Sequence, residues 1–364
     1  MHAAPRVIDF VLRNKESSWG DLEDLDEDDI ARAPQRFVGG RNSWIAQSYV
    51  RLRPALEAAG WTVRASSRFG PGAVAVVHRD DANRFASGAH ASFLVVVRAD
   101  RAPVVACDFA LAQNALALAS KERFLPLWPQ PGLRPRDAAR GSGVRRIAYV
   151  GRTGSAPAWF ADRDFLRALR FRGIEFEVRR AGWDDYSGID VALAARVDTL
   201  AQLRTKPATK LYNAWLAGVP MIAFPEPAYA ELRRSPLDFI EAAGPRDVLA
   251  ALDLLRANPR LYAAMAHNGR MRGSEFGVPA VRARWLEFLE GEVARAFEAA
   301  RPRLTGRRGW YLSAMAAQKA RSRLHRLRVG YERWRDAGAM RPLRGEERMP
   351  LLECAADHFR HVRR

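Results

Sequence analysis

Cysteine is scarce in this chain of 364 residues: only Cys107 and Cys354 are present. Two cysteines are too few for a disulfide framework or a cluster of thiolate metal ligands, so we expect neither. A reducing cytoplasm is the simplest compartment for such a chain.

Long hydrophobic runs are also missing. No stretch of about 18 apolar residues occurs, so the sequence predicts no membrane-spanning helix. The first residues lack an apolar signal core followed by a small-residue cleavage site, and they lead directly into a strand-like segment at residues 7–12. Both observations favour a cytoplasmic protein.

Acidic residues are outnumbered, with 41 Asp and Glu against 59 Lys and Arg, a formal net charge of +18. Such a balance favours anionic partners: nucleic acid, acidic lipid surfaces or phosphorylated substrates. Residues 301–364 hold 17 basic and 6 acidic side chains, so 17 − 6 = +11 of the excess lies there. An acidic run at residues 21–29 predicts a solvated loop; the alternative is an intramolecular partner for the basic surface.

Length and hydropathy predict two globular domains. A chain of 364 residues, 48% of them hydrophobic, is too long for one ordinary core. In the first half we expect strands at residues 7–12, 61–65, 73–78, 92–97 and 104–108, and helices at 43–59 and 114–120. The prolines of residues 128–135 exclude a helix or central strand, so residues 128–143 are the expected linker region.

The second half alternates strands and helices regularly. We expect strands at residues 147–150, 174–178, 189–195 and 221–224, and helices at 162–171, 207–217 and 281–298. This alternation predicts a parallel sheet covered on both faces, with ligands bound beyond the carboxyl ends of its strands. That rule places residues 151–154, Arg196 and residues 206–213 on one rim.

The most informative stretch runs from Thr205 to Glu226. Lys206 and Lys210 flank the start of a short helix, which Pro207 and a capping Thr205 or Thr209 would open. Gly218 suits the left-handed position after the helix, and a buried strand follows. A helix N-terminus beside two lysines is suited to a phosphate. The alternative is an ordinary surface helix with two solvated lysines.

The order of these segments resembles the C-terminal half of GT-B glycosyltransferases, of the group 1 type. The resemblance is carried by residues 146–154, 205–232, 245–249, 258–262 and 265–269. It implies two Rossmann-like domains facing a cleft: an N-terminal acceptor domain (1–135), a linker (136–144) and a nucleotide-sugar domain (145–290). A cross-over helix and a basic helical tail (291–364) would follow.

The resemblance also implies site residues. The donor, a UDP- or GDP-sugar, would contact Gly151, Arg152, Thr153, Arg196, Lys206, Thr209, Lys210, Asn213 and Glu226. A glycine-rich loop with Gly39, Gly40, Arg41 and Asn42 would face the acceptor or the cleft. Many retaining members carry two glutamates at the positions of Thr205 and Asn213, and both are absent here. The stereochemical outcome therefore stays open.

The charge of a diphosphate leaving group must be neutralised during transfer. No Asp-x-Asp motif lies in a clear loop context, and residues 24–29 contain this spacing only as part of an acidic run. We therefore expect no metal and no other cofactor, and neutralisation by Lys206, Lys210, Arg152 and Arg196. Candidates for the base that activates the acceptor are His78, Asp80 and Asp108, at expected strand ends.

The resemblance implies a glycosyltransferase that acts on a glycan or glycolipid acceptor, in cell-envelope polysaccharide synthesis. We expect the Arg- and Trp-bearing tail to rest on an anionic bilayer, at the inner face of the membrane. One alternative is a non-catalytic GT-B-like scaffold or sugar-binding protein. Another is a basic nucleic-acid-binding protein, which the absence of a known nucleic-acid-binding module disfavours.

Overall fold

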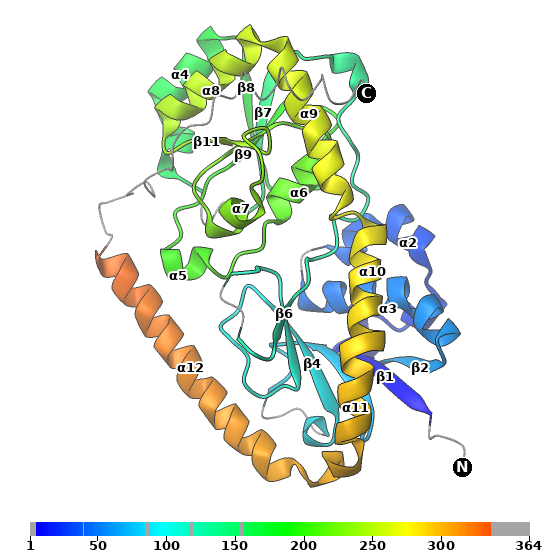
Figure 1. The fold of residues 1–364 in the computed structure, drawn as a ribbon. Coiled ribbons are helices and arrows are strands. Elements are labelled where there is room, and N and C mark those ends of the chain that lie inside the picture. Colours follow the sequence, from blue (N-terminus) through cyan, green and yellow to red (C-terminus); the bar gives the residue numbers. More distant parts are fainter. Residues whose placement is uncertain are drawn as a thin grey trace. The chain divides into compact units, whose positions relative to one another are not determined.

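The fold was analysed in a computed structural model that describes residues 5–38, 40–83, 88–116, 119–152, 154 and 156–335 (Figure 1). The described residues form two compact units. Unit 1 combines those of 1–132 with 205–207 and 278–331, and unit 2 combines those of 133–204 with 208–277 and the remainder. The observed boundary between Gly132 and Leu133 lies within the linker region expected at 128–143 and precedes the narrower linker, 136–144, that the resemblance implies. The helices from Val278 onward belong largely to unit 1.

Unit 1 is built on a parallel sheet that has six strands within the described residues, in the order β2-β1-β3-β4-β5-β6. The parallel pairing is that of a Rossmann-like, doubly wound domain, and the order of the first five strands is the flavodoxin-like variant of that fold. The strands are β1 (Arg6–Val11), β2 (Trp61–Ser66), β3 (Val74–His78), β4 (Phe93–Ala99), β5 (Phe109–Ala112) and β6 (Glu122–Phe124).

Strand β4 shows why this sheet is covered on both faces. Phe93, Val95 and Val97 are buried in one core, while Leu94 and Val96 are buried in another. The first core also receives α3 (Arg41–Ala58), α10 (Val278–Phe288) and α11 (Ala294–Ala300), and the second receives the start of α12 (Arg308–Arg335). Because strand side chains alternate, a run of consecutive apolar residues satisfies both faces.

The helix expected over residues 281–298 is confirmed and is longer, because a π-helical turn, η7 (Leu289–Val293), joins α10 to α11. Figure 1 shows the three segments as one nearly continuous rod. The expected buried side chains Trp285, Phe288, Leu289 and Phe297 are all in the core.

Two expected elements of unit 1 are wrong. The strand predicted at residues 104–108 lies instead at Phe109–Ala112, because the Gln318 side chain accepts the N–H groups of Val105 and Ala106. The described residues of the predicted helix at 114–120 form turns. There the Asn114 carboxamide oxygen accepts the N–H of Leu116, a local bond that competes with helix formation.

The acidic run is not the loop that we predicted. It contains η1 (Leu22–Asp24) and α2 (Glu27–Arg32), and the side chains of Asp26 and Asp29 form a reciprocal capping box at the start of α2. Asp21 pairs with Arg36, and Glu27 pairs with Arg282. The alternative interpretation, an intramolecular partner for basic side chains, is therefore the better one. The remaining short helices of unit 1 are α1 (Lys15–Ser18), η2 (Pro34–Phe37), η3 (Ala89–Ala91) and η8 (Arg301–Gly306).

Unit 2 is a second Rossmann-like unit. Within the described residues its parallel sheet has five strands in the order β11-β10-β9-β7-β8. The four strands expected here are confirmed, and β11 was not predicted. They are β7 (Arg146–Val150), β8 (Glu175–Arg179), β9 (Val191–Ala194), β10 (Met221–Ala223) and β11 (Ile240–Glu241). Its helices are η4 (Ala138–Arg140), η6 (Ala158–Ala161), α4 (Arg163–Phe171), α5 (Leu200–Leu203), α6 (Thr209–Leu216), α7 (Pro227–Leu232), α8 (Pro245–Ala257) and α9 (Pro259–Ser274).

Helix α6 differs from its prediction at one end only. It begins at Thr209 with Ala208 at the N-cap and no side-chain cap, so neither threonine caps it. At the other end Gly218 has φ +67°, as expected for the residue that ends the helix. Among the described residues, no helix of either unit combines the length and hydropathy needed to cross a bilayer.

Helices α6 and α9 pack closely because α9 presents glycines to α6. A Cβ atom on Gly273 would lie 2.8 Å from the Leu216 nitrogen and 3.1 Å from its Cα, both backbone atoms that cannot move aside cheaply. The Trp215 indole, beside this contact, donates to the Asp238 carbonyl at 2.8 Å. The contact holds α6, and with it Lys210, against the rest of unit 2.

We predict that Gly273→Ala destabilises unit 2 by about 1–3 kcal/mol through overpacking. The matched control is Gly330→Ala on α12, where an added Cβ meets nothing within 4 Å. That change should stabilise by about 0.5–1 kcal/mol through helix propensity. Urea unfolding followed by tryptophan fluorescence measures both, and equal effects of the two variants would contradict the close-packing argument.

Candidate functional site

The topology of unit 2 places a candidate site where strand order reverses. Strand β7 lies between β8 and β9, so the chain leaves β7 toward one side and later continues on the other. Ligands of such sheets bind beyond the carboxyl ends of the strands at this point. The residues that follow β7, β9 and β10 there are Gly151, Arg196 and Glu226. Lys210 reaches the same place from the first turn of α6.

These side chains form a buried charge cluster, which we define as Tyr149, Arg196, Lys210, Glu226 and Tyr229. The Lys210 Nζ lies 3.7 Å from the centre of the Tyr149 ring, in a cation–π contact, and has no hydrogen-bond partner. The Arg196 Nη1 lies 3.3 Å from Oε2 of Glu226, whose residue is 2% exposed. The buried Tyr229 hydroxyl lies beside the Glu226 carboxylate.

Gly151 is required by this arrangement. Its φ is +147°, a conformation that other residues rarely adopt, and a Cβ atom there would lie 3.1 Å from the Lys210 Nζ. The glycine therefore leaves room for the lysine.

Burial sets the electrostatics of the cluster. Burial, followed by the nearby Arg196 charge, lowers the pKa of Lys210 well below its ordinary value. Burial and the Glu226 carboxylate raise the pKa of Tyr229 well above its ordinary value, and burial raises that of Tyr149. The cluster therefore holds a desolvated cation whose charged form would be stabilised by an incoming anion.

Of the predicted donor-binding residues, the structure brings Gly151, Arg196, Lys210 and Glu226 together. Lys206 does not join them: its Nζ pairs with Asp100 at 2.9 Å, within unit 1. The remaining predicted residues lie near the same segments. Arg152 is exposed and its carbonyl accepts from the Tyr149 hydroxyl, Thr209 accepts from Tyr212, Asn213 is buried on α6, and Thr153 lies outside the described residues.

Unit 1 has a corresponding place beyond the carboxyl ends of β1 and β3, where its own strand order reverses. His78, the last residue of β3, is buried, and burial lowers its pKa to about 4. Its Nδ1 accepts the N–H of Asp80 at 3.2 Å. The Asp80 carboxylate is held by Arg101, with Nη2 at 2.9 Å.

Asp81 is the acid of this region that the sequence analysis missed. It is 3% exposed, its Oδ2 lies 3.5 Å from the Arg41 Nε, and burial raises its pKa. The same Oδ2 is buried without a hydrogen-bond partner. Its position directly after Asp80 was the available signal. Tyr149 and Tyr229 were also missed, because aromatic residues in or beside a strand are usually core residues.

Asp108, predicted as a catalytic candidate at the carboxyl end of a strand, lies elsewhere. It precedes β5 and so lies at the amino end of that strand, at the edge opposite to His78. Both of its oxygens accept from Arg307, at 2.7 and 2.9 Å, and one also accepts the N–H of Leu94. Asp108 therefore anchors the segment before α12 to the sheet.

The predicted glycine-rich loop is only partly described, because Gly39 lies outside the described residues. Gly40 is the N-cap of α3, with extended backbone, and Arg41 is the first residue of that helix. Asn42 follows, and its carboxamide oxygen is buried without a hydrogen-bond partner. Arg41 thereby joins Asp81 at the edge of the sheet where His78 lies.

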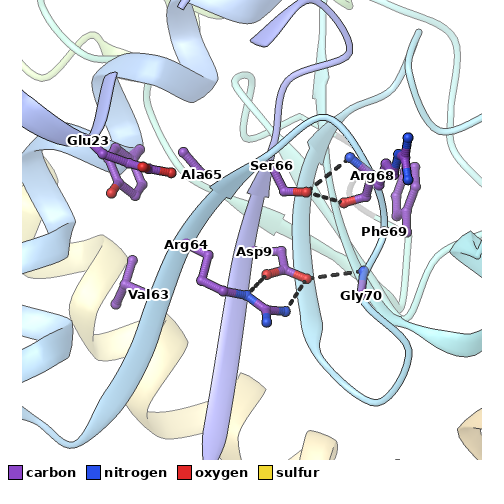
Figure 2. A pocket seen from close by; sticks show the side chains of 10 residues that line it. Asp9, Glu23, Val63, Arg64, Ala65, Ser66, Arg68, Phe69 and Gly70 are labelled. Carbon is purple, nitrogen blue, oxygen red and sulfur yellow. Dashed lines mark hydrogen bonds and ion pairs between the residues drawn. The ribbon is translucent and has the colours of Figure 1, made fainter. Parts of the chain in front are cut away.

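A separate pocket of about 460 Å³ lies beside β1 and β2 of unit 1. Figure 2 shows Asp9 at its centre, between Arg64 and the backbone of Gly70. The Asp9 carboxylate accepts from the Arg64 Nε at 2.7 Å, from its Nη2 at 3.1 Å and from the Gly70 N–H at 3.1 Å. These bonds satisfy the buried carboxylate within the protein, so the pocket shows no polar group that demands a ligand.

Comparison with known proteins gave no family model and no curated protein that matches the chain. Solved structures do resemble it. HepE of Anabaena in complex with UDP is 10% identical over 79% of this chain and 100% of that chain, with a TM-score of 0.45. Sucrose-phosphate synthase of Thermosynechococcus elongatus is 13% identical over 82% of this chain and 100% of that chain, with a TM-score of 0.48. An α1,3-fucosyltransferase with GDP is 10% identical over 80% of this chain and 92% of that chain, with a TM-score of 0.44.

We predict that Lys210→Met stabilises the ligand-free protein by about 1–3 kcal/mol, because it removes a desolvated cation and keeps the apolar stem. The lysine binds its proton less tightly in the folded than in the unfolded chain. The buried charge therefore lowers the free energy of unfolding by its full amount below the lowered pKa of the folded chain. This loss vanishes above the ordinary lysine pKa of about 10.4.

Wild-type stability should consequently rise with pH through that window relative to Lys210→Met, whose curve lacks this contribution. Urea unfolding at a series of pH values from 6 upward measures the difference. Parallel curves for the two proteins would contradict a depressed pKa at Lys210.

Proposed function

We propose that this protein is a glycosyltransferase that takes its sugar from a nucleotide-diphosphate donor, and that the buried charge cluster of unit 2 holds the diphosphate. The observation that carries the proposal is the Lys210 ammonium, buried without a hydrogen-bond partner at the switch point of a Rossmann-like sheet. The likeness of the surrounding segments to GT-B sequences supports the choice of reaction.

A bound phosphate would compensate for the burial of the Lys210 ammonium. A buried ammonium without a hydrogen bond costs free energy, which a phosphate oxygen would recover by accepting from it. Arg196, on the neighbouring strand end, supplies a second cation, and the backbone at Gly151 can approach the ligand closely. Such fixed cations stabilise the charge that develops on a leaving diphosphate. We propose that Lys210 and Arg196 supply this stabilisation and that Glu226 contacts the donor sugar.

The proposed acceptor is the hydroxyl of a glycan or glycolipid, as in cell-envelope polysaccharide synthesis, and it would bind to unit 1. We propose Asp81 as the group that removes the hydroxyl proton. Its raised pKa makes it a stronger base than an exposed carboxylate, and Arg41 orients it. His78 is the weaker candidate, since a pKa of about 4 makes it a poor base at neutral pH.

The first test is nucleotide binding. UDP and GDP, which are bound in two of the similar structures, and their sugars should bind to the wild type. Lys210→Ala or Arg196→Ala should weaken binding by about tenfold or more, because each removes a charge-assisted hydrogen bond worth about 1.5–3 kcal/mol. Isothermal titration calorimetry measures the affinities.

The matched control is Lys206→Ala, which removes a lysine four residues away that is already paired with Asp100. Its nucleotide affinity should equal that of the wild type. Equal losses in the Lys206 and Lys210 variants would indicate a general charge effect, and the diphosphate site would then be assigned wrongly.

The second test separates an enzyme from a non-catalytic sugar-binding protein. One observation favours the non-catalytic alternative: the carboxylate of Asp80, a predicted base, is already bound by Arg101. Asp81→Asn should keep nucleotide-sugar binding and lower transfer by about 10²-fold or more. Wild-type transfer should fall as pH drops through the raised Asp81 pKa, because protonation removes the base.

Transfer is measured as UDP or GDP release that depends on an added acceptor, with Asp108→Asn as the control. Asp108 lies at the opposite edge of the sheet, so its replacement should affect stability rather than the pH profile. Binding without release from any donor and acceptor pair would support the non-catalytic alternative.

A further inference from the structure

The outer face of α12 carries an exposed apolar stripe. Leu324, Leu327, Tyr331 and Trp334 are 65, 70, 58 and 77% exposed, high values for large apolar side chains. Their spacings of three, four and three residues place them along one side of the helix, over about 15 Å at 1.5 Å per residue. Isolated exposed apolar residues are ordinary, but an aligned stripe marks a surface that is covered in function.

Basic side chains border this stripe on both sides. Arg321, Arg328 and Arg335 follow one another at seven-residue spacing along one side, and Lys319, Arg323 and Arg326 lie on the other. Over Arg308–Arg335 there are eight Lys or Arg and one Glu, so 8 − 1 = +7. The outer face of α12 is therefore an apolar centre with cationic margins.

The inner face of α12 is firmly packed. Tyr311 and Ala314 are buried in the second core of unit 1. The Gln318 side chain accepts from the Val105 and Ala106 N–H groups at 3.0 and 3.3 Å, and the Ser322 hydroxyl accepts from Arg79 at 2.8 Å. These contacts fix the rotation of the helix about its axis, and the stripe lies on the opposite, exposed side of the helix.

We propose that the outer face of α12 docks on an anionic lipid bilayer, with the helix lying in the plane of the interface. Leucine, tyrosine and tryptophan would enter the boundary between headgroups and acyl chains, where the two aromatic side chains can keep their polar atoms hydrated. The flanking arginines have stems long enough to reach the phosphates on either side of the stripe. Each basic residue near such a surface contributes about 1 kcal/mol, a factor of about five in affinity.

The same face suits a lipid surface better than nucleic acid or a second copy of the chain. A phosphate backbone offers hydrogen-bond acceptors and negative charge but no apolar surface, so the four large apolar side chains at the centre of the basic face would remain exposed against it. Two copies that paired through this stripe would bring their arginine margins together, with like charges opposed. A bilayer of anionic lipids satisfies both the apolar centre and the cationic margins.

The experiment is co-sedimentation of the full chain with vesicles of phosphatidylcholine, with and without about 30% phosphatidylglycerol. We expect binding to the anionic vesicles only. Leu324→Ser combined with Leu327→Ser should weaken it by about tenfold, and Arg321→Gln, Arg328→Gln and Arg335→Gln combined by about a hundredfold. Raising the salt concentration should weaken wild-type binding as well.

The matched control is Phe171→Ser combined with Met271→Ser, which removes two other exposed apolar residues, 91 and 62% exposed, from unit 2. This variant should bind vesicles like the wild type. Nucleotide affinity, measured in parallel, should be unchanged in every variant, so failure of this proposal is distinguishable from failure of the diphosphate site.

Three results would overturn the proposal. The first is no binding to anionic vesicles. The second is an equal loss in the Phe171 and Met271 variant. The third is unchanged vesicle binding in the α12 variants, together with the loss of another association that the wild type shows. That association would be binding to a random 30-nucleotide RNA, or a dimer seen by analytical ultracentrifugation.

Discussion

The parallel pairing of β7, β9 and β10 is the constraint on which the candidate site depends. Because the three strands run in the same direction, the residues that follow them emerge at one edge, and groups distant in sequence become neighbours. Gly151 and Arg196 are brought there by the sheet alone. Lys210 is added by α6, whose position is fixed by its glycine-mediated contact with α9. The site is a consequence of backbone geometry first and of charge second.

Burial gives this geometry its chemical character. A solvated lysine and arginine would bind phosphate weakly, because water competes for both partners. Within the cluster, the Tyr149 ring covers the Lys210 ammonium, and the protein offers it no hydrogen bond. The ligand-free protein thus carries an electrostatic cost at the place where an anion would remove it. Asp81 of unit 1 shows the same principle with the opposite sign, as a buried carboxylate whose Oδ2 lies 3.5 Å from the Arg41 Nε.

The two halves of the chain differed in how well their structure could be predicted. Unit 2 follows regular strand–helix alternation, and its expected strands and the end of α6 at Gly218 were confirmed. In unit 1, residues 104–108 have the apolar composition of a strand, yet Gln318, more than 200 residues away, takes two of their N–H groups. Local composition cannot reveal a competitor so remote in sequence. The prediction of a loop at residues 21–29 was wrong for the opposite reason. The capping box of Asp26 and Asp29 is a local signal for a helix, and the acidic composition obscured it.

The sequence by itself determined that the chain has two domains and that the second is a parallel sheet covered on both faces, because length and strand–helix alternation are properties of the chain itself. That both are Rossmann-like units was implied by the resemblance to GT-B sequences and is confirmed by the fold. The sequence also placed Gly151, Arg196 and Lys210 on one rim, since the carboxyl ends of parallel strands must meet, whereas Glu226 was implied by the resemblance. Only the tertiary structure decided that Lys206 pairs with Asp100, that Asp108 is bound by Arg307, and that Asp81 rather than Asp80 is the buried acid beside Arg41. Those outcomes depend on which side chains meet across long stretches of chain, and on which of two adjacent residues faces inward, and neither is encoded in local pattern.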